Sequence, residues 1–163
     1  MESQQNLSKQ LGKLLSEQRL VLTTAESCTG GGVSTAITDI AGSSAWFDRA
    51  FITYSNEAKM EMLGVKAETL QEHGAVSEET VLEMVRGAVS HSNANIGVSI
   101  SGVAGPGGGS IDKPVGTVWF AWADDCGWQH SALYHFEGDR AQVRKQAIHV
   151  AQEVLYNELT RRR

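Results

Sequence analysis

Cysteine is scarce in this chain, with Cys28 and Cys126 the two examples among 163 residues. So low a count cannot build a disulfide framework, and it is typical of proteins in the reducing cytoplasm. The five histidines are scattered, and the sequence contains neither C-x-x-C nor H-E-x-x-H. We therefore expect a fold without disulfides, no metal centre and no cofactor.

Long apolar runs are missing as well. No stretch approaches the roughly 20 residues needed to span a bilayer, and the polar segment 1–10 lacks the apolar region of a signal peptide. Positive charge is not in excess, since 14 Lys and Arg stand against 19 Asp and Glu. The sequence thus predicts a cytoplasmic protein that binds neither membranes nor nucleic acid. Its 41% of hydrophobic residues suffice for one domain over 1–163.

An apolar strand that runs straight into a helix is the clearest pattern in the chain. Residues 20–22 are apolar, Gly30 and Gly31 open the next segment, and apolar residues follow it at helical spacing. The turn between them lies at a helix N-terminus, where unpaired backbone N–H groups can stabilise an oxyanion. Ser27 in this turn is the candidate nucleophile. In the alternative interpretation, Ser27 and Thr29 only cap the helix.

A base for Ser27 is harder to identify. No histidine lies in a motif typical of a catalytic triad, and the serine lacks the G-x-S-x-G frame of hydrolase elbows. Tyr54 ends the β-prone segment 51–54, and Lys59 follows it by five residues. Because strand ends gather at one edge of an α/β sheet, Tyr54 and Lys59 can meet Ser27 there. A lysine whose pKa is lowered by burial can act as a base there. The alternative is an exposed lysine on an amphipathic helix.

Cys28 competes with Ser27 for the role of nucleophile. A thiol is the better nucleophile, and its pKa falls at a helix N-terminus. Two adjacent side chains cannot both face the same cleft, so only one of the pair can serve. A buried structural cysteine is the alternative, and the sequence leaves the choice open.

Two further segments can hold an anion. The glycine-rich loop 102–110 follows the β-prone segment 96–101, and its backbone N–H groups can bind a phosphate or a carboxylate. It matches neither the P-loop nor G-x-G-x-x-G, so a flexible connection is the alternative. Arg140 and Arg144 at the start of the last helix supply cations, unless they only form a solvated helix face.

The remaining elements follow from periodicity and capping residues. Strands are expected before Ser27 and at 51–54, 96–101, 115–123 and 128–136. Helices are expected before residue 20, from Gly30 to a cap at Gly42, around Lys59 to Gly64, over 66–73, after Ser77, and after an Asp139–Gln142 capping box. The order mixes β-α-β crossovers with a hairpin. It predicts a layered α/β/α domain with a mixed sheet that includes an antiparallel hairpin.

Six motifs occur in order along the chain, at 24–31, 42–44, 54–59, 74–77, 102–109 and 113–118. Together they resemble the CinA C-terminal domain family, in its short stand-alone bacterial form. The characterised activity of that family is nicotinamide mononucleotide deamidation. The resemblance therefore implies hydrolysis of the carboxamide to nicotinic acid mononucleotide and ammonia, in pyridine nucleotide salvage.

The resemblance also implies roles for single residues. Ser27 would be the nucleophile, Lys59 the base and Tyr54 an assisting residue. Ser101 stands where the family usually has threonine, so the hydroxyl is kept and the methyl is lost. The residues expected to bind substrate are Thr29, Gly30, Gly31, Ser101, Gly102, Gly105, Gly107, Gly108, Arg140 and Arg144.

Two other functions stay open at this point. One is a catalytically silent nucleotide-binding or regulatory module of the same fold. The other is hydrolysis of a different amide or of a phosphate ester. The small size of the chain and the aromatic residues of the 115–136 hairpin favour a homodimer.

Overall fold

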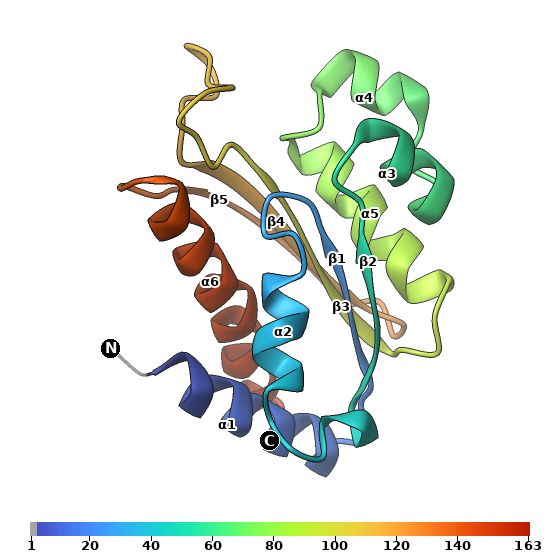
Figure 1. Cartoon of the computed structure of the whole chain (residues 1–163). Coiled ribbons are helices and arrows are strands. Elements are labelled where there is room, and N and C mark those ends of the chain that lie inside the picture. Colours follow the sequence, from blue (N-terminus) through green and yellow to red (C-terminus); the bar gives the residue numbers. More distant parts are fainter. Residues whose placement is uncertain (1–2) are drawn as a thin grey trace.

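Five strands form one mixed sheet in the order β2-β1-β3-β4-β5 (Figure 1). β1 (Leu22–Glu26) lies between β2 (Phe47–Ile52) and β3 (Ile96–Gly102) and runs parallel to both. β4 (Thr117–Asp124) and β5 (Gln129–His135) continue the sheet as an antiparallel hairpin. The computed structural model describes residues 3–163. The mixed sheet and its hairpin confirm the fold class expected from the sequence.

Helices cover both faces of this sheet (Figure 1). On one face lie α1 (Gln4–Glu17), α2 (Gly32–Thr38) and α6 (Arg140–Arg161). On the other face lie α3 (Asn56–Leu63), α4 (Ala67–His73) and α5 (Glu78–Ser90). The predicted α/β/α layering is therefore confirmed.

The alternation of β3 explains how the two faces are packed. Its large side chains Ile96, Val98 and Ile100 are fully buried in the core formed with α1, α2 and α6. The small residues between them face α5, where Ser99 Oγ donates to the Val81 carbonyl at 2.6 Å. A Cβ added at Gly97 would lie 3.1–3.3 Å from neighbouring side chains. Small residues on this face let the helix approach closely.

Helix ends mostly agree with the predicted caps. Ser77 caps α5 with its side chain, and Asp139 forms the expected capping box at α6. For α3, where Ser55 and Asn56 are both possible caps from the sequence, the cap is Ser55. The prediction for Gly42 is wrong, because α2 ends at Thr38 and Gly42, with a φ of 85°, begins the short 3-10 helix Ser43–Ala45. The turn after α2 therefore stops the helix one turn earlier than the glycine suggests.

The predicted strand at 51–54 is also misplaced. β2 begins at Phe47, ends at Ile52 and pairs with β1 from Leu22↔Phe47 to Glu26↔Ile52. Its polar residues Asp48 and Arg49 hide the strand from a search for apolar β-prone runs. An edge strand tolerates such residues because only one of its sides pairs with the sheet. Residues 53–54 leave the sheet and lead into α3.

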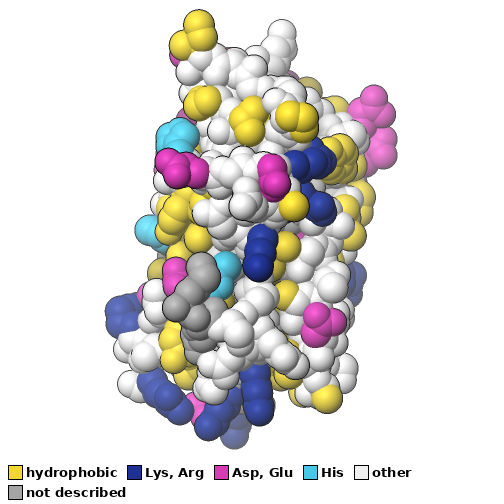
Figure 2. All heavy atoms as spheres, turned by 60° about the vertical axis from the view of Figure 1, so that its left-hand side comes forward, with side chains coloured by type: hydrophobic (Ala, Val, Ile, Leu, Met, Phe, Trp, Pro, Cys, Tyr) yellow, Lys and Arg dark blue, Asp and Glu magenta, His cyan; other side chains and the backbone are white. Residues whose placement is uncertain are grey.

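No helix within residues 3–163 is long and apolar enough to cross a bilayer. In the same residues, no group of three or more His, Cys, Asp and Glu side chains is placed to hold a metal ion. On the face shown in Figure 2, acidic and basic side chains are interspersed, with basic ones gathered at the lower end. The described part of that face thus carries scattered charges of both signs.

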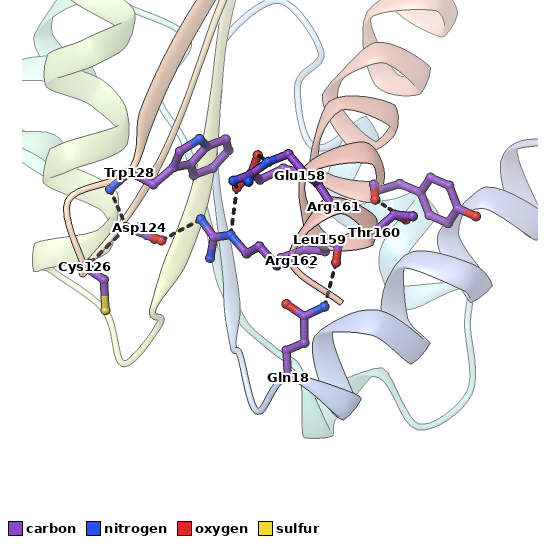
Figure 3. A network of polar contacts seen from close by, with 10 residues as sticks. Gln18, Asp124, Cys126, Trp128, Glu158, Leu159, Thr160, Arg161 and Arg162 are labelled. Atoms are coloured by element: carbon purple, nitrogen blue, oxygen red, sulfur yellow. Dashed lines mark hydrogen bonds and ion pairs between the residues drawn. The ribbon is translucent and has the colours of Figure 1, made fainter.

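A polar network holds the end of α6 to the β4–β5 turn (Figure 3). Arg162 donates to Asp124 at 2.9 Å and to Glu158 at 2.8 Å, and its guanidinium lies 5.2 Å from the centre of the Trp128 ring. The other carboxylate oxygen of Asp124 accepts from the backbone N–H groups of Cys126 and Trp128, both at 2.9 Å. The network therefore ties the last helix to the hairpin by a largely buried ion pair.

We expect Arg162→Ala to lower the free energy of unfolding by about 2 kcal/mol, because it leaves the Asp124 carboxylate without its charged partner. Urea titration followed by circular dichroism measures the loss. Arg163→Ala is the matched control, since Arg163 pairs with Glu17 while 58% exposed. Its effect should stay within about 0.5 kcal/mol. Equal losses of unfolding free energy in the two variants would show that the Arg162 network stabilises the fold no more than an exposed ion pair does.

Candidate active site

The carboxyl ends of the three parallel strands meet at one edge of the sheet. Ser27 follows β1, Thr53 and Tyr54 follow β2, and Ser101 lies near the end of β3. A cavity of about 250 Å³ opens at this edge, a size suited to a small molecule or to part of one. Its lining residues are Ser27, Cys28, Tyr54, Asn56, Lys59, Ala75, Val76, Ser101, Gly102, Ala104 and Arg140.

A larger cleft of about 870 Å³ lies elsewhere, between the start of α1 and the first half of α6. Its lining includes Gln142, Lys145 and His149 but none of the residues predicted for catalysis. Size alone does not define an active site, because the chemistry depends on which polar groups converge. The smaller cavity is the one with convergent groups.

Ser27 and Lys59 lie together in the small cavity. Lys59 Nζ is 3.0 Å from Ser27 Oγ, and it also contacts the carbonyl oxygens of Thr53 at 2.9 Å and Tyr54 at 3.1 Å. Both side chains are buried, at 1% exposed for the lysine and 7% for the serine. An uncharged amine has two N–H groups and one lone pair. The two carbonyls can therefore accept the N–H groups while the lone pair faces the serine hydroxyl.

The environment of Lys59 makes this uncharged form easier to reach than it is for an exposed lysine. Burial lowers the pKa of the lysine amine from 10.5 to about 8, with the neighbouring Cys28 acting weakly in the opposite sense. The structure thus excludes the alternative of an exposed lysine on a helix surface. α3 begins at Asn56, one residue after the Ser55 cap, and places Lys59 on its first turn. From there its amine reaches Ser27 in the turn 27–31 between β1 and α2, which we call the elbow.

Cys28 is in a different position from Ser27. Burial raises the pKa of its thiol from 9.0 to about 11, and the side chain packs in the core formed with α2 and α6, although the residue also borders the cavity. A thiol held in its protonated form is a poor nucleophile. Of the two adjacent residues, the geometry therefore favours Ser27.

The N-terminus of α2 differs from the expectation of unpaired N–H groups. The carboxylate of Glu26 accepts from the backbone N–H groups of Val33 and Ser34 at 2.9 Å and of Gly31 at 3.2 Å. The Thr29 hydroxyl donates to the same carboxylate at 2.7 Å. The helix is therefore capped by Glu26, and the interpretation in which Ser27 and Thr29 cap it is wrong.

Two donors of the elbow stay available. Within residues 3–163, the backbone N–H groups of Cys28 and Thr29 donate to no other residue, whereas that of Gly30 donates to the Ser27 carbonyl at 3.0 Å. Free N–H groups next to a nucleophile are the usual composition of an oxyanion hole. The set of candidate donors thus narrows to Cys28 and Thr29.

The two arginines of α6 have different surroundings. Arg144 donates to the carbonyl oxygens of Cys28 and Thr29, both at 3.1 Å, and so holds the elbow against the helix. Arg140 lines the cavity and donates to the Gly105 carbonyl at 2.8 Å and to the Tyr54 hydroxyl at 3.3 Å. Of the pair, Arg140 is the one placed to meet a ligand.

The other predicted residues fall into two groups. Tyr54, Ser101 and Gly102 line the cavity with Ser27, Lys59 and Arg140. Tyr54 is 62% exposed and contacts Lys59 through its backbone, whereas Ser101 is 1% exposed. The predicted residues that do not line it are Thr29, Gly30, Gly31, Gly105, Gly107, Gly108 and Arg144.

Several lining residues were missed in the sequence. Ala75, Val76 and Ala104 carry no reactive group, so no chemical pattern marks them. Asn56 lies two residues after Tyr54 at the start of α3, and its polar side chain beside two predicted residues was a usable signal.

The fold and the site together define a class: an α/β protein with a serine–lysine pair in a small cavity. The cavity opens where the parallel strands of the mixed sheet end. Comparison with known proteins narrows this class. The family model described as the CinA C-terminal domain matches residues 4–159, and the chain belongs to this family.

Curated relatives match over nearly the whole chain. The nicotinamide-nucleotide amidohydrolase PncC of Escherichia coli (strain K12) is 56% identical over 152 residues, which covers 93% of this chain and 92% of the relative. The protein of the same name from Pseudomonas putida is 51% identical over 142 residues, covering 87% and 88%. A CinA-like protein of Endomicrobium trichonymphae is 45% identical, but the match spans only 36% of that longer protein.

Solved structures share the fold. The competence/damage inducible protein CihA from Agrobacterium tumefaciens superimposes with a TM-score of 0.94 at 42% identity, covering 98% of this chain and 97% of the other. A competence-damaged protein (CinA) superfamily protein from Escherichia coli gives 0.89 at 37% identity, covering 94% and 90%.

Proposed function

We propose that this chain hydrolyses the carboxamide of nicotinamide mononucleotide to nicotinic acid mononucleotide and ammonia, with Ser27 as nucleophile and Lys59 as base. The observation that carries the proposal is the 3.0 Å hydrogen bond between Lys59 Nζ and Ser27 Oγ in a cavity. The substrate is supported by the name nicotinamide-nucleotide amidohydrolase, which relatives 51–56% identical to this chain bear.

The proposed reaction has two halves. Ser27 Oγ attacks the amide carbon while Lys59 Nζ takes the hydroxyl proton. The oxygen that becomes negative is stabilised by the N–H groups of Cys28 and Thr29, and one such donor is worth roughly 10²–10³ in rate. The C–N bond then breaks, the protonated lysine returns its proton to the leaving nitrogen, and ammonia departs. Water attacks the resulting ester with Lys59 again as base, which releases the acid and restores the serine.

Arg140 is the residue we assign to the phosphate of the substrate. It lines the cavity, and one of its two contacts is to a tyrosine hydroxyl that a charged phosphate can displace. Arg144 is already engaged by two carbonyls behind the elbow. Until the phosphate replaces it, the Tyr54 hydroxyl accepts from Arg140 and so holds the guanidinium at the cavity.

Arg140→Ala should raise KM by about 10- to 100-fold and change kcat much less, because a charge-assisted contact to a remote group is lost. Steady-state kinetics with nicotinamide mononucleotide measures both constants. Arg86→Ala is the control, since Arg86 is exposed, contacts Gln129 at the start of β5 and does not line the cavity. An Arg140 variant with unchanged KM would remove this residue from phosphate binding.

The activity should depend on pH in the direction set by Lys59. The uncharged amine is the active form, so kcat/KM is expected to rise tenfold per pH unit below a pKa of about 8 and to level off above it. With an ordinary pKa of 10.5 the rise would continue beyond pH 10. A profile from pH 6 to pH 10 tests this. A rate that is flat over pH 6–9 would contradict the role of the lysine.

Ammonia release from nicotinamide mononucleotide by the purified chain, with a chelator present, tests the proposed function. We expect ammonia and nicotinic acid mononucleotide in equal amounts, and less product from nicotinamide, other amides or phosphate esters. Binding of the nucleotide without release of ammonia would instead identify a catalytically silent module. The homodimer, the single domain over 1–163 and the cytoplasmic location stay predictions.

A further inference from the structure

We propose that Glu26 is a positioning residue for this reaction: its carboxylate shapes the elbow so that the Ser27 hydroxyl faces Lys59 and two backbone N–H groups stay free for the oxyanion. The inference rests on the proposed function for the identity of the reaction. Glu26 is the last residue of β1 and immediately precedes Ser27, and its side chain is fully buried.

Both oxygens of the carboxylate are used, and all their partners are hydrogen-bond donors. Oε1 accepts from the Thr29 hydroxyl and from the N–H groups of Gly31 and Val33. Oε2 accepts from the N–H of Ser34 at 2.9 Å and from the Thr24 hydroxyl at 3.1 Å. No Lys, Arg or His among residues 3–163 contacts this carboxylate, so the start of α2 provides its compensation.

These contacts close the chain into a loop around the nucleophile. The acceptor precedes Ser27 by one residue, and the donors come from the segment 29–34 that follows it. The Ser27 N–H donates to the Ile100 carbonyl at 3.0 Å, which extends β1 along β3 by one residue. The nucleophile is therefore held by the sheet on one side and by the Glu26 contacts on the other.

The same contacts decide which elbow donors are left over. Glu26 takes the N–H groups of Gly31, Val33 and Ser34, and the Ser27 carbonyl takes that of Gly30. Among the residues of this turn, Cys28 and Thr29 are then the ones whose N–H groups donate to no other residue within 3–163. Without the carboxylate, the backbone N–H groups at the start of α2 would need other acceptors. The chain between Ser27 and α2 would then no longer be held in one conformation.

Position 26 requires a carboxylate because every group that contacts its two side-chain oxygens is a hydrogen-bond donor. A glutamine at this position would have nearly the same shape, but its NH₂ group would face donors in place of one oxygen. One backbone N–H of α2 would then lose its acceptor in a buried site. The Glu26→Gln variant therefore changes the elbow while removing almost no packing.

The test compares Glu26→Gln with Glu83→Gln in the full chain. Glu83 also places a carboxylate on a helix N-terminus, accepting from the Lys66 N–H at 2.9 Å and the Thr69 hydroxyl at 2.6 Å, but it lies outside the cavity. We expect Glu26→Gln to lower kcat by about 100-fold, the effect of a displacement near 1 Å, with KM changed less than about threefold. Glu83→Gln should keep both constants.

Two smaller changes keep the test decisive if Glu26→Gln does not fold. Thr29→Val removes the hydroxyl that donates to Glu26 and should lower kcat by about tenfold, the effect of one hydrogen bond. Thr29→Ser restores a hydroxyl and should recover most of the rate. A structural role alone would change stability in both variants without this recovery of kcat.

A second readout does not depend on the substrate. A fluorophosphonate reagent reacts with an activated serine: the Ser27 oxygen bonds to phosphorus, fluoride leaves and Lys59 accepts the proton. Intact mass gives the labelling rate, and Ser27→Ala serves as the blank. We expect Glu26→Gln to be labelled far more slowly than the wild type at equal folded fraction.

Wild-type labelling and wild-type kcat in this variant would overturn the proposal. Labelling of the wild type without ammonia release would overturn the proposed function instead, and the labelling rates would still decide the role of Glu26.

Discussion

Ser27→Ala is expected to lower ammonia release from nicotinamide mononucleotide by about 10⁴-fold or more, because the variant lacks the oxygen that bonds to the amide carbon. No neighbouring group replaces it. The Cys28 thiol lies in the core with its pKa raised to about 11. Nucleotide binding should persist, since Arg140 and Ser101 are untouched. A coupled ammonia assay measures the rate, and calorimetric titration measures the binding.

Cys28→Ala is the matched control for this prediction. It changes the adjacent residue by one heavy atom, removes a buried thiol and should lower stability by about 1 kcal/mol while most activity remains. An active Ser27→Ala enzyme, or an inactive Cys28→Ala enzyme that is still folded, would move the nucleophile to the neighbouring position.

Lys59→Met is expected to have the second largest effect, a loss of about 10²–10⁴ in kcat, the usual contribution of a general base. Methionine resembles the lysine chain in length, so the interior position stays filled. Alanine is less suitable because Lys59 is 1% exposed and its loss would leave a cavity. The carbonyls of Thr53 and Tyr54 lose a donor, which should cost about 1–3 kcal/mol of stability.

Lys59→Arg separates proton transfer from charge. Arginine keeps a positive group near Ser27 but cannot be deprotonated in a protein. We therefore expect it to be as inactive as Lys59→Met. An arginine variant that retained a large share of kcat would show that position 59 acts through its charge and not as a base. Stopped assays at pH 8, together with unfolding curves for both variants, distinguish these outcomes.

The class of fold could be predicted because local patterns agree with it. The alternation of β3 between large and small residues, the capping serines and the Asp139–Gln142 pair each specify one element, and the structure contains all of them. β2 could not be placed correctly, since its position depends on pairing with β1 and not on its own composition. The same holds for Gly42, whose turn is set by where α2 packs.

The candidate site was partly predictable for a similar reason. Strand ends share one edge, so Ser27, Tyr54 and Lys59 could be expected to converge from their order alone. Glu26 could not be assigned in the same way. Its role requires knowing that the chain turns back within eight residues, so that a carboxylate meets the start of α2. The different contacts of Arg140, to Tyr54 at the cavity, and of Arg144, to the Cys28 carbonyl, could not be predicted either. Both arginines lie on one helix a single turn apart, so only the tertiary structure distinguishes them.

Covalent attack by Ser27 is the central claim, and hydroxylamine partitioning tests it most directly. If the cavity releases ammonia as proposed, it also admits a nucleophile of similar size, so hydroxylamine should compete with water for the ester on Ser27. We expect the hydroxamate of the nucleotide to form in place of part of the acid, in proportion to the hydroxylamine added, with total product equal to the ammonia released. Acid as the sole product at every hydroxylamine concentration would contradict it.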